Sequence, residues 1–78
     1  MADSSKLLVA IDRSEREKLH VAINEYKGRS YLDLRIFYTT DNGETWRPTQ
    51  KGVTCAPEHL ETLRDAVEEA MKEFMAIE

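Results

Sequence analysis

The sequence predicts an α+β domain: a curved antiparallel sheet of four to five strands followed by one long C-terminal amphipathic helix. Three observations support this fold class. Apolar and polar residues alternate over residues 18–26 and 31–37, with the period of two of a half-buried strand. An Asp-Asn-Gly turn signal follows at residues 41–43. Beyond Pro57 the apolar spacing changes to that of a helix.

The first predicted element is a hairpin. Residues 7–11 form a short apolar run, and the polar residues 12–16 that follow are typical of a turn. The simplest interpretation pairs this run with the alternating strand over residues 18–26. A helix over residues 14–22 is the weaker alternative because the apolar spacing fits it poorly.

The next predicted strands are separated by turns. Residues 27–28 interrupt the alternation as a tight turn would, and residues 31–37 form the clearest strand. A short strand near residues 45–47 and a last one at residues 51–55 should follow. Pro48 lacks an amide proton, which predicts a position at a sheet edge or a bend.

The C-terminal segment predicts a helix whose apolar stripe contributes to the core and to a dimer contact. Pro57 is suited to a first helical turn, and Glu58 and Glu61 complement the positive end of the helix dipole. The apolar residues that follow at helical spacing are Leu60, Leu63, Val67, Ala70, Met71 and Phe74. The opposite side of this helix is acidic, which is typical of a solvated face.

Size and composition predict a single small domain that associates with itself. The chain has 78 residues, of which 41% are hydrophobic and 33% charged. We expect a flexible N-terminus over residues 1–6 and one domain over residues 7–78. Such a core seldom supplies more than ~3–5 kcal/mol. One Cys excludes an intramolecular disulfide, and one Cys with two His makes no structural zinc site. A homodimer is therefore expected, without cofactor or metal.

Charge and hydropathy indicate which partners to expect. No apolar run approaches the ~18–20 residues of a membrane span, so we expect an intracellular protein without a membrane partner. The net charge is −4, but residues 18–52 have a balance of +2 and residues 53–78 a balance of −5. Local fields decide what a surface attracts, so the middle segment can bind an anion while the acidic end favours solubility.

Aromatic and basic side chains share one face of the predicted sheet. The face opposite the apolar residues carries His20, Asn24, Tyr26, Tyr31, Asp33, Arg35 and Phe37. The adjoining turn adds Lys27 and Arg29. Bases stack on exposed rings while Lys and Arg follow the phosphates, so this face predicts binding of single-stranded nucleic acid. We expect Asp33 to pair with a neighbouring basic residue and orient it.

The residues from His20 to Ala70 resemble the positive cofactor four family of transcriptional coactivators and its bacterial relatives. The segments that carry the resemblance are residues 24–29, 31–35, 46–48, 51–54 and 57–58. The resemblance implies a strongly curved antiparallel sheet with a C-terminal helix, dimerisation, and binding of single-stranded or unpaired DNA with little sequence preference. The basic, Ser-rich tail of eukaryotic members is missing, which favours a bacterial or phage-type member.

The resemblance also implies a set of nucleic-acid contacts. Carried over position by position, these are Tyr26, Lys27, Arg29, Arg35, Tyr38, Arg47 and Lys51. Trp46 lies just outside this set, and we include it as a candidate contact. Gln50 occupies a position that is commonly basic in the family, which should weaken phosphate attraction.

One of these contacts conflicts with the strand alternation. Tyr38 belongs to the same alternating set as Leu34 and Ile36, opposite Arg35. A β-bulge or a strong twist near the end of the strand would reconcile Tyr38 with a role in stacking. Without either, Tyr38 belongs to the core and Phe37 becomes the better stacking candidate.

The predicted function is a homodimeric, sequence-tolerant single-stranded-DNA-binding protein that acts as a cofactor in transcription, replication or repair. Transcription or replication proteins are then its expected protein partners. Two alternatives stay open: an RNA-binding regulator that uses the same sheet face, and a protein–protein adaptor. An enzyme is not expected, because the sequence offers no catalytic triad, phosphate loop or metal-ligand spacing.

Overall fold

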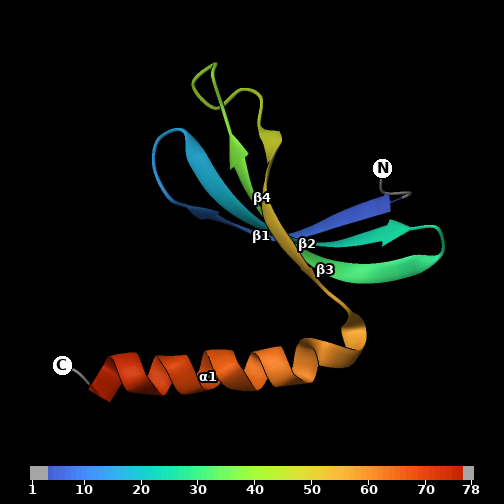
Figure 1. Cartoon of the computed structure of the whole chain (residues 1–78). Helices are drawn as coiled ribbons and strands as arrows, with labels where there is room; N and C mark the ends of the chain where they lie inside the picture. Colours follow the sequence, from blue (N-terminus) through green and yellow to red (C-terminus); the bar gives the residue numbers. More distant parts are fainter. Residues whose placement is uncertain (1–3, 77–78) are drawn as a thin grey trace.

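The computed structural model describes residues 4–76, which form a four-stranded sheet followed by one long helix (Figure 1). The elements are β1 (Ser4–Asp12), β2 (Glu17–Tyr26), β3 (Arg29–Tyr38), β4 (Arg47–Cys55), the one-turn 3₁₀ helix η1 (Pro57–His59) and α1 (Leu60–Ala76). The predicted fold class is confirmed, and Pro57 opens the helical segment as expected.

The first strand is longer than predicted. β1 begins at Ser4, three residues before the expected start. Residues 4–6 belong to the strand because they continue the antiparallel pairing with residues 23–25 of β2. The hydroxyl of Ser5 also donates to Oδ1 of Asn24 at 2.6 Å. Residues 4–6, which were expected to belong to a flexible N-terminus, therefore lie in β1. Residues 1–3 lie outside the described residues.

The strands follow the order β1-β2-β3-β4, and all neighbours are antiparallel. The two short strands predicted before the helix are one strand, β4. It runs through Pro48 because an edge strand can leave amide positions unpaired, as the sequence predicted for this proline. Between Arg35 and Phe37 the register with β4 shifts, so that residues 49–51 lie opposite Ile36. Such a bulge bends its strand and increases the local twist.

The unbroken β2–β3 register sorts side chains onto two faces, because paired residues of an antiparallel ladder point to the same side. The apolar face carries Leu19, Val21, Ile23, Leu32, Leu34 and Ile36. The polar face carries His20, Ala22, Asn24, Asp33, Arg35 and Phe37. The alternation in the sequence predicted this division.

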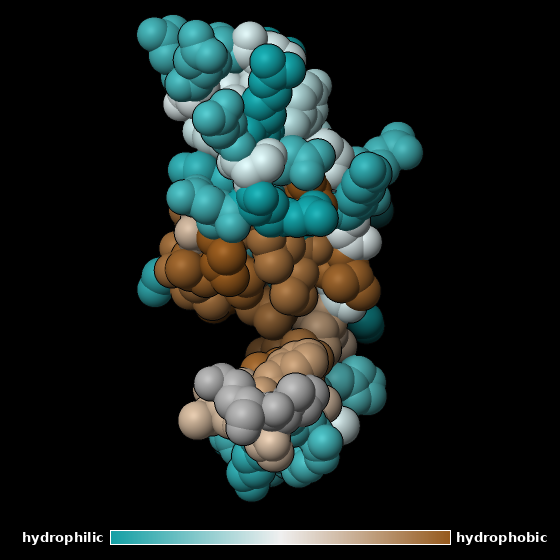
Figure 2. Space-filling view, turned by 90° about the vertical axis from the view of Figure 1, so that its left-hand side faces the viewer, coloured by the Kyte–Doolittle hydropathy of each residue, from teal (hydrophilic) through white to brown (hydrophobic). Residues whose placement is uncertain are grey.

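The helix does not cover the apolar face of its own chain. In Figure 1, α1 runs below the sheet, and Figure 2 shows an apolar band on the side of the sheet that faces the helix. The helix residues Val67, Met71 and Phe74 are 51%, 57% and 70% exposed. Among the described hydrophobic residues only Ala22 is buried. The radius of gyration is 14.6 Å, whereas a compact domain of this length has about 11.5 Å. One chain therefore lacks a closed core.

Within residues 4–76, no helix combines the length and the apolar character needed to cross a membrane.

Candidate nucleic-acid interface

The β2–β3 hairpin carries three of the predicted contacts. Tyr26 pairs with Arg29, and the intervening Lys27 and Gly28 have φ angles of 52° and 77°. Positive φ at both central positions is the geometry of a type I′ turn, which matches the twist of the flanking strands. The Lys27 ammonium lies 5.2 Å from the centroid of the Tyr26 ring, which is itself 38% exposed. This turn places an accessible ring and two cations together at one end of the sheet.

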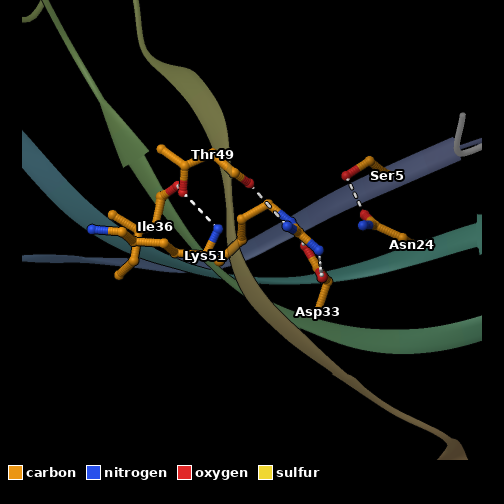
Figure 3. Close-up of polar contacts among 7 residues, drawn as sticks. Ser5, Asn24, Asp33, Ile36, Thr49 and Lys51 are labelled. Atoms are coloured by element: carbon orange, nitrogen blue, oxygen red, sulfur yellow. Dashed lines mark hydrogen bonds and ion pairs between the residues drawn. The ribbon is translucent and has the colours of Figure 1, made fainter.

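Arg35 lies on the polar face and is held by three hydrogen bonds. Its Nε and Nη2 atoms each donate to the Asp33 carboxylate at 3.1 Å, and Nη1 donates to the carbonyl oxygen of Thr49 at 2.9 Å (Figure 3). The side chain of Asp33 is 8% exposed, so the guanidinium fork neutralises a buried carboxylate. The expectation that Asp33 pairs with a basic neighbour and orients it is confirmed.

Gly52 leaves the space that this arrangement needs. A Cβ atom at position 52 would lie 2.6 Å from Cζ of Arg35. Arg35 and Gly52 are paired across β3 and β4, so the guanidinium packs directly over the glycine backbone. The Arg35 side chain is 26% exposed and joins β3 to the edge strand.

Thr49 holds the bulge through its hydroxyl. This group donates to the carbonyl oxygen of Ile36 at 2.8 Å and accepts from the backbone amide of Lys51 at 3.1 Å (Figure 3). Both contacts fix the backbone on either side of the irregular pairing. Lys51, which the sequence predicted as a contact, therefore extends from an ordered and exposed edge of the sheet.

Trp46 and Arg47 lie at the end of the sheet opposite the hairpin. The Nζ atom of Lys18 is 4.7 Å from the centroid of the Trp46 ring and 3.8 Å from Oδ1 of Asp12. Arg47 opens β4 and pairs with Tyr38. In the sequence, Lys18 counted only toward the charge of the basic middle segment. Its contact with Trp46 places the β3–β4 connection beside the start of β2.

Tyr38 and Phe37 occupy different sides of β3. The bulge lies on β4, and β2 and β3 stay in register, so Tyr38 remains in the alternating set of Leu34 and Ile36. Tyr38 is nevertheless 36% exposed, because it ends its strand. Phe37 lies on the polar face, where its ring stacks on His20 with centroids 3.9 Å apart and an interplanar angle of 14°.

The β3–β4 connection is held by Thr39 and Asp41. The Thr39 hydroxyl donates to the Asp41 carboxylate at 2.7 Å, and the amide of Thr45 donates to the same carboxylate at 2.8 Å. These two hydrogen bonds, that of Thr39 first, lower the pKa of Asp41 to about 2. The amide of Thr39 also donates to the carbonyl oxygen of Arg16 at 3.0 Å. The two connections at this end of the sheet are therefore tied together.

The predicted contacts thus fall into two groups. The hairpin group is Tyr26, Lys27 and Arg29, and the loop group is Tyr38, Trp46 and Arg47. Nine residue steps along β3 separate the groups by about 30 Å, with Arg35 and Lys51 between them. The structure does not gather these residues into one pocket. By strand parity Tyr26, Arg29 and Arg35 share the polar face, whereas Tyr38 and its partner Arg47 belong to the alternating set of the opposite face. The polar-face residues follow the sheet, an arrangement typical of proteins that bind an extended single strand.

Comparison with known proteins identifies the family. The family model described as Transcriptional Coactivator p15 (PC4) matches residues 14–66. The chain is also similar to BPSL1147, a PC4 homolog from Burkholderia pseudomallei. The orthorhombic crystal form gives a TM-score of 0.81 with 26% identity over 94% of this chain and 97% of that one. The tetragonal form gives 0.77 with 25% identity over 87% and 98%. No curated protein matches the chain.

The fold is an open antiparallel sheet that carries aromatic and basic side chains and is followed by one long helix. Because the family match covers more than half of the sequence, the chain belongs to the PC4 family of transcriptional coactivators. The similarity to a bacterial homolog agrees with the bacterial type that the sequence predicted.

Proposed function

We propose that the protein is a homodimeric, sequence-tolerant single-stranded-DNA-binding protein that serves as a cofactor in transcription, replication or repair. The observation that carries this proposal is the β2–β3 hairpin, where the accessible Tyr26 ring adjoins Lys27 and Arg29 at the end of an open polar face. Family membership supports DNA as the ligand.

Unpaired DNA suits this surface better than duplex DNA. Base stacking on an aromatic ring contributes ~1–3 kcal/mol per base, and it is available only when the base has left its own stack. Duplex DNA is usually recognised by a helix that lies in the major groove. The helix of this chain, α1, is too acidic for that role. Strand contacts through stacking and phosphates depend little on sequence.

The second copy in this proposal supplies the missing core. The apolar face and the apolar stripe of α1 are both uncovered in one chain, with Val53 63% and Phe74 70% exposed. A soluble monomer rarely exposes continuous apolar patches of this kind. A stable dimer buries about 1,200–2,000 Å² in total. In a dimer, the apolar face of the sheet and the apolar stripe of α1 from each chain would form this interface. Dimerisation leaves the polar face open.

The test is a binding titration with single-stranded, duplex and bubble DNA at about 50 and about 200 mM salt. Single-stranded and bubble DNA should bind, more weakly at the higher salt, and duplex DNA should bind least. Equal affinity for duplex and single strand would contradict the proposal. A matched RNA strand tests the alternative ligand, and a tenfold or greater preference for RNA would replace DNA with RNA. Binding of no strand, with a stable protein complex instead, would favour an adaptor.

Variants test the hairpin itself. Replacing Lys27 and Arg29 with Ala should weaken binding similarly for all sequences and reduce the salt slope by ~0.7 per lost phosphate contact. Lys72→Ala is the matched control, because it removes a lysine of α1 away from the hairpin. An unchanged affinity of the double variant would remove the hairpin from the interface.

A further inference from the structure

The polar face contains a recess that none of the eight predicted contacts lines, although Phe37, the alternative to Tyr38, does. Its volume is about 290 Å³, and it lies between β1, β2 and β3. The lining residues that matter here are Leu7, His20, Ala22, Asn24, Asp33 and Phe37. Ala22 is 8% exposed and Asp33 is 5% exposed, so the recess has a packed base.

One wall of the recess is the stacked pair of His20 and Phe37. The two rings are nearly parallel, with centroids 3.9 Å apart. Burial, and secondarily the positive charge of Lys18, lowers the pKa of His20, which favours the neutral imidazole at pH 7. In such a pair, each ring has one face that does not contact the other ring. A third flat ring can stack on that face. Leu7 of β1 adds an apolar side chain to the lining.

Polar groups stand beside this wall. The Ser5 hydroxyl donates to Oδ1 of Asn24, which leaves the amide N–H groups of Asn24 to donate to another partner (Figure 3). The Asp33 carboxylate accepts two bonds from Arg35 and retains further acceptor sites. Donors and acceptors beside an aromatic wall match the edge and the face of a nucleobase.

The surrounding charge is suited to a polyanion. Lys18 precedes His20 by two residues on the same side of β2, and Arg35 occupies the corresponding position before Phe37 on β3. The only carboxylate in the lining, that of Asp33, is compensated by Arg35. A phosphate chain that passes the recess therefore meets no uncompensated carboxylate in its lining.

We propose that this recess holds one unpaired nucleobase, stacked on the His20–Phe37 pair with its polar edge toward Asn24 and Asp33. The inference rests on the proposed function and adds base contacts in the middle of the sheet, between the hairpin group and the loop group. A second copy of the chain is a poorer occupant, because its exposed apolar side chains match the opposite face.

The experiment compares oligo(dT) with an abasic strand of the same length, which keeps the phosphates and lacks the bases. Phe37→Leu keeps an apolar side chain but removes the ring. It should weaken oligo(dT) binding at least about fivefold, the loss that corresponds to ~1 kcal/mol for one stacked base. Binding of the abasic strand should not change. Phe37→Tyr, which retains the ring, should bind both strands as the unaltered protein does.

His20→Ala repeats the test from the other ring of the pair, with His59→Ala as its matched control on η1. Only the first variant should lose affinity for oligo(dT). Thermal unfolding and sedimentation accompany each variant, and if Phe37→Leu does not fold, His20→Ala decides the outcome. The inference would be overturned if either variant lost affinity equally for oligo(dT) and for the abasic strand. It would also be overturned if the recess bound a side chain of another protein and no DNA.

The two proposals fail in different ways. If the unaltered protein binds neither strand, the proposed function is wrong. If it prefers oligo(dT) but Phe37→Leu and His20→Ala keep that preference in full, the proposed function stands and the base recess is wrong.

Discussion

The two faces of the sheet differ in how far one chain satisfies their side chains: the polar groups of one face are paired, whereas the apolar residues of the other are exposed. On the polar face the buried Asp33 accepts two hydrogen bonds from Arg35, and the edge strand is fixed by Thr49. On the apolar face Ile23 and Val53 remain 41% and 63% exposed, because the chain's own helix does not cover them. Residues that alternate along the same strands therefore have separate roles. The polar side is organised within a single chain, whereas the apolar side is left uncovered by that chain.

The largest expected effect comes from a charge on the apolar face. Val53→Asp should abolish the dimer and destabilise the fold by more than about 3 kcal/mol, because a partner would bury the carboxylate without a counter-charge. Sedimentation and thermal unfolding measure both effects. If the chain acted alone, a side chain 63% exposed would tolerate the change.

Gln50→Asp is the matched control for this variant. It places the same charge on β4 at an exposed position of the bulge. We expect a dimer with nearly unchanged unfolding temperature. Similar behaviour of the two variants, both harmless or both disruptive, would contradict the assignment of the apolar face to a second copy.

An intermediate effect is expected on the polar face at Gly52. Gly52→Ala should cost about 1–3 kcal/mol, because the added methyl group overlaps the held guanidinium of Arg35. In an Arg35→Ala background the same change should cost clearly less, since the overlapping group is gone. Denaturant unfolding of the four proteins in this cycle provides the measurement. Equal costs in both backgrounds would show that Arg35 does not constrain Gly52.

The smallest effect concerns the β3–β4 connection. The pKa of Asp41 falls from its ordinary value of 3.8 to about 2 in the folded protein. The ionised carboxylate therefore stabilises the folded connection above about pH 4, and this contribution is lost as the pH falls toward about 2. Asp41→Asn should lack this part of the pH dependence. Amide exchange at Gly43 and Thr45 measures it, and identical pH profiles of the two proteins would contradict the Asp41 hydrogen bonds.

Local patterns were sufficient to predict most of the fold. Period-two alternation identified β2 and β3 and assigned their residues to faces, and helical spacing after Pro57 identified α1. The turn at residues 27–28 was evident from its glycine and matches the observed positive φ angles. The unity of β4 was missed, because its continuity depends on the Thr49 hydroxyl and on a bulge that no local pattern encodes.

The candidate site was predictable in composition but less so in arrangement. Tyr26, Lys27 and Arg29 are neighbours in sequence and remain neighbours in the hairpin. The position of Tyr38 depends on which strand contains the bulge, and the contact between Lys18 and Trp46 joins elements far apart in the chain. Such contacts follow from tertiary packing, which sequence spacing does not report.

The most direct test of this division of the sheet is an amide NMR titration of the dimer with oligo(dT). We expect resonance changes at residues 26–29, in β4 at residues 47–51, and around His20 and Phe37, with α1 largely unaffected. Changes concentrated in α1, with the hairpin unmoved, would contradict this expectation.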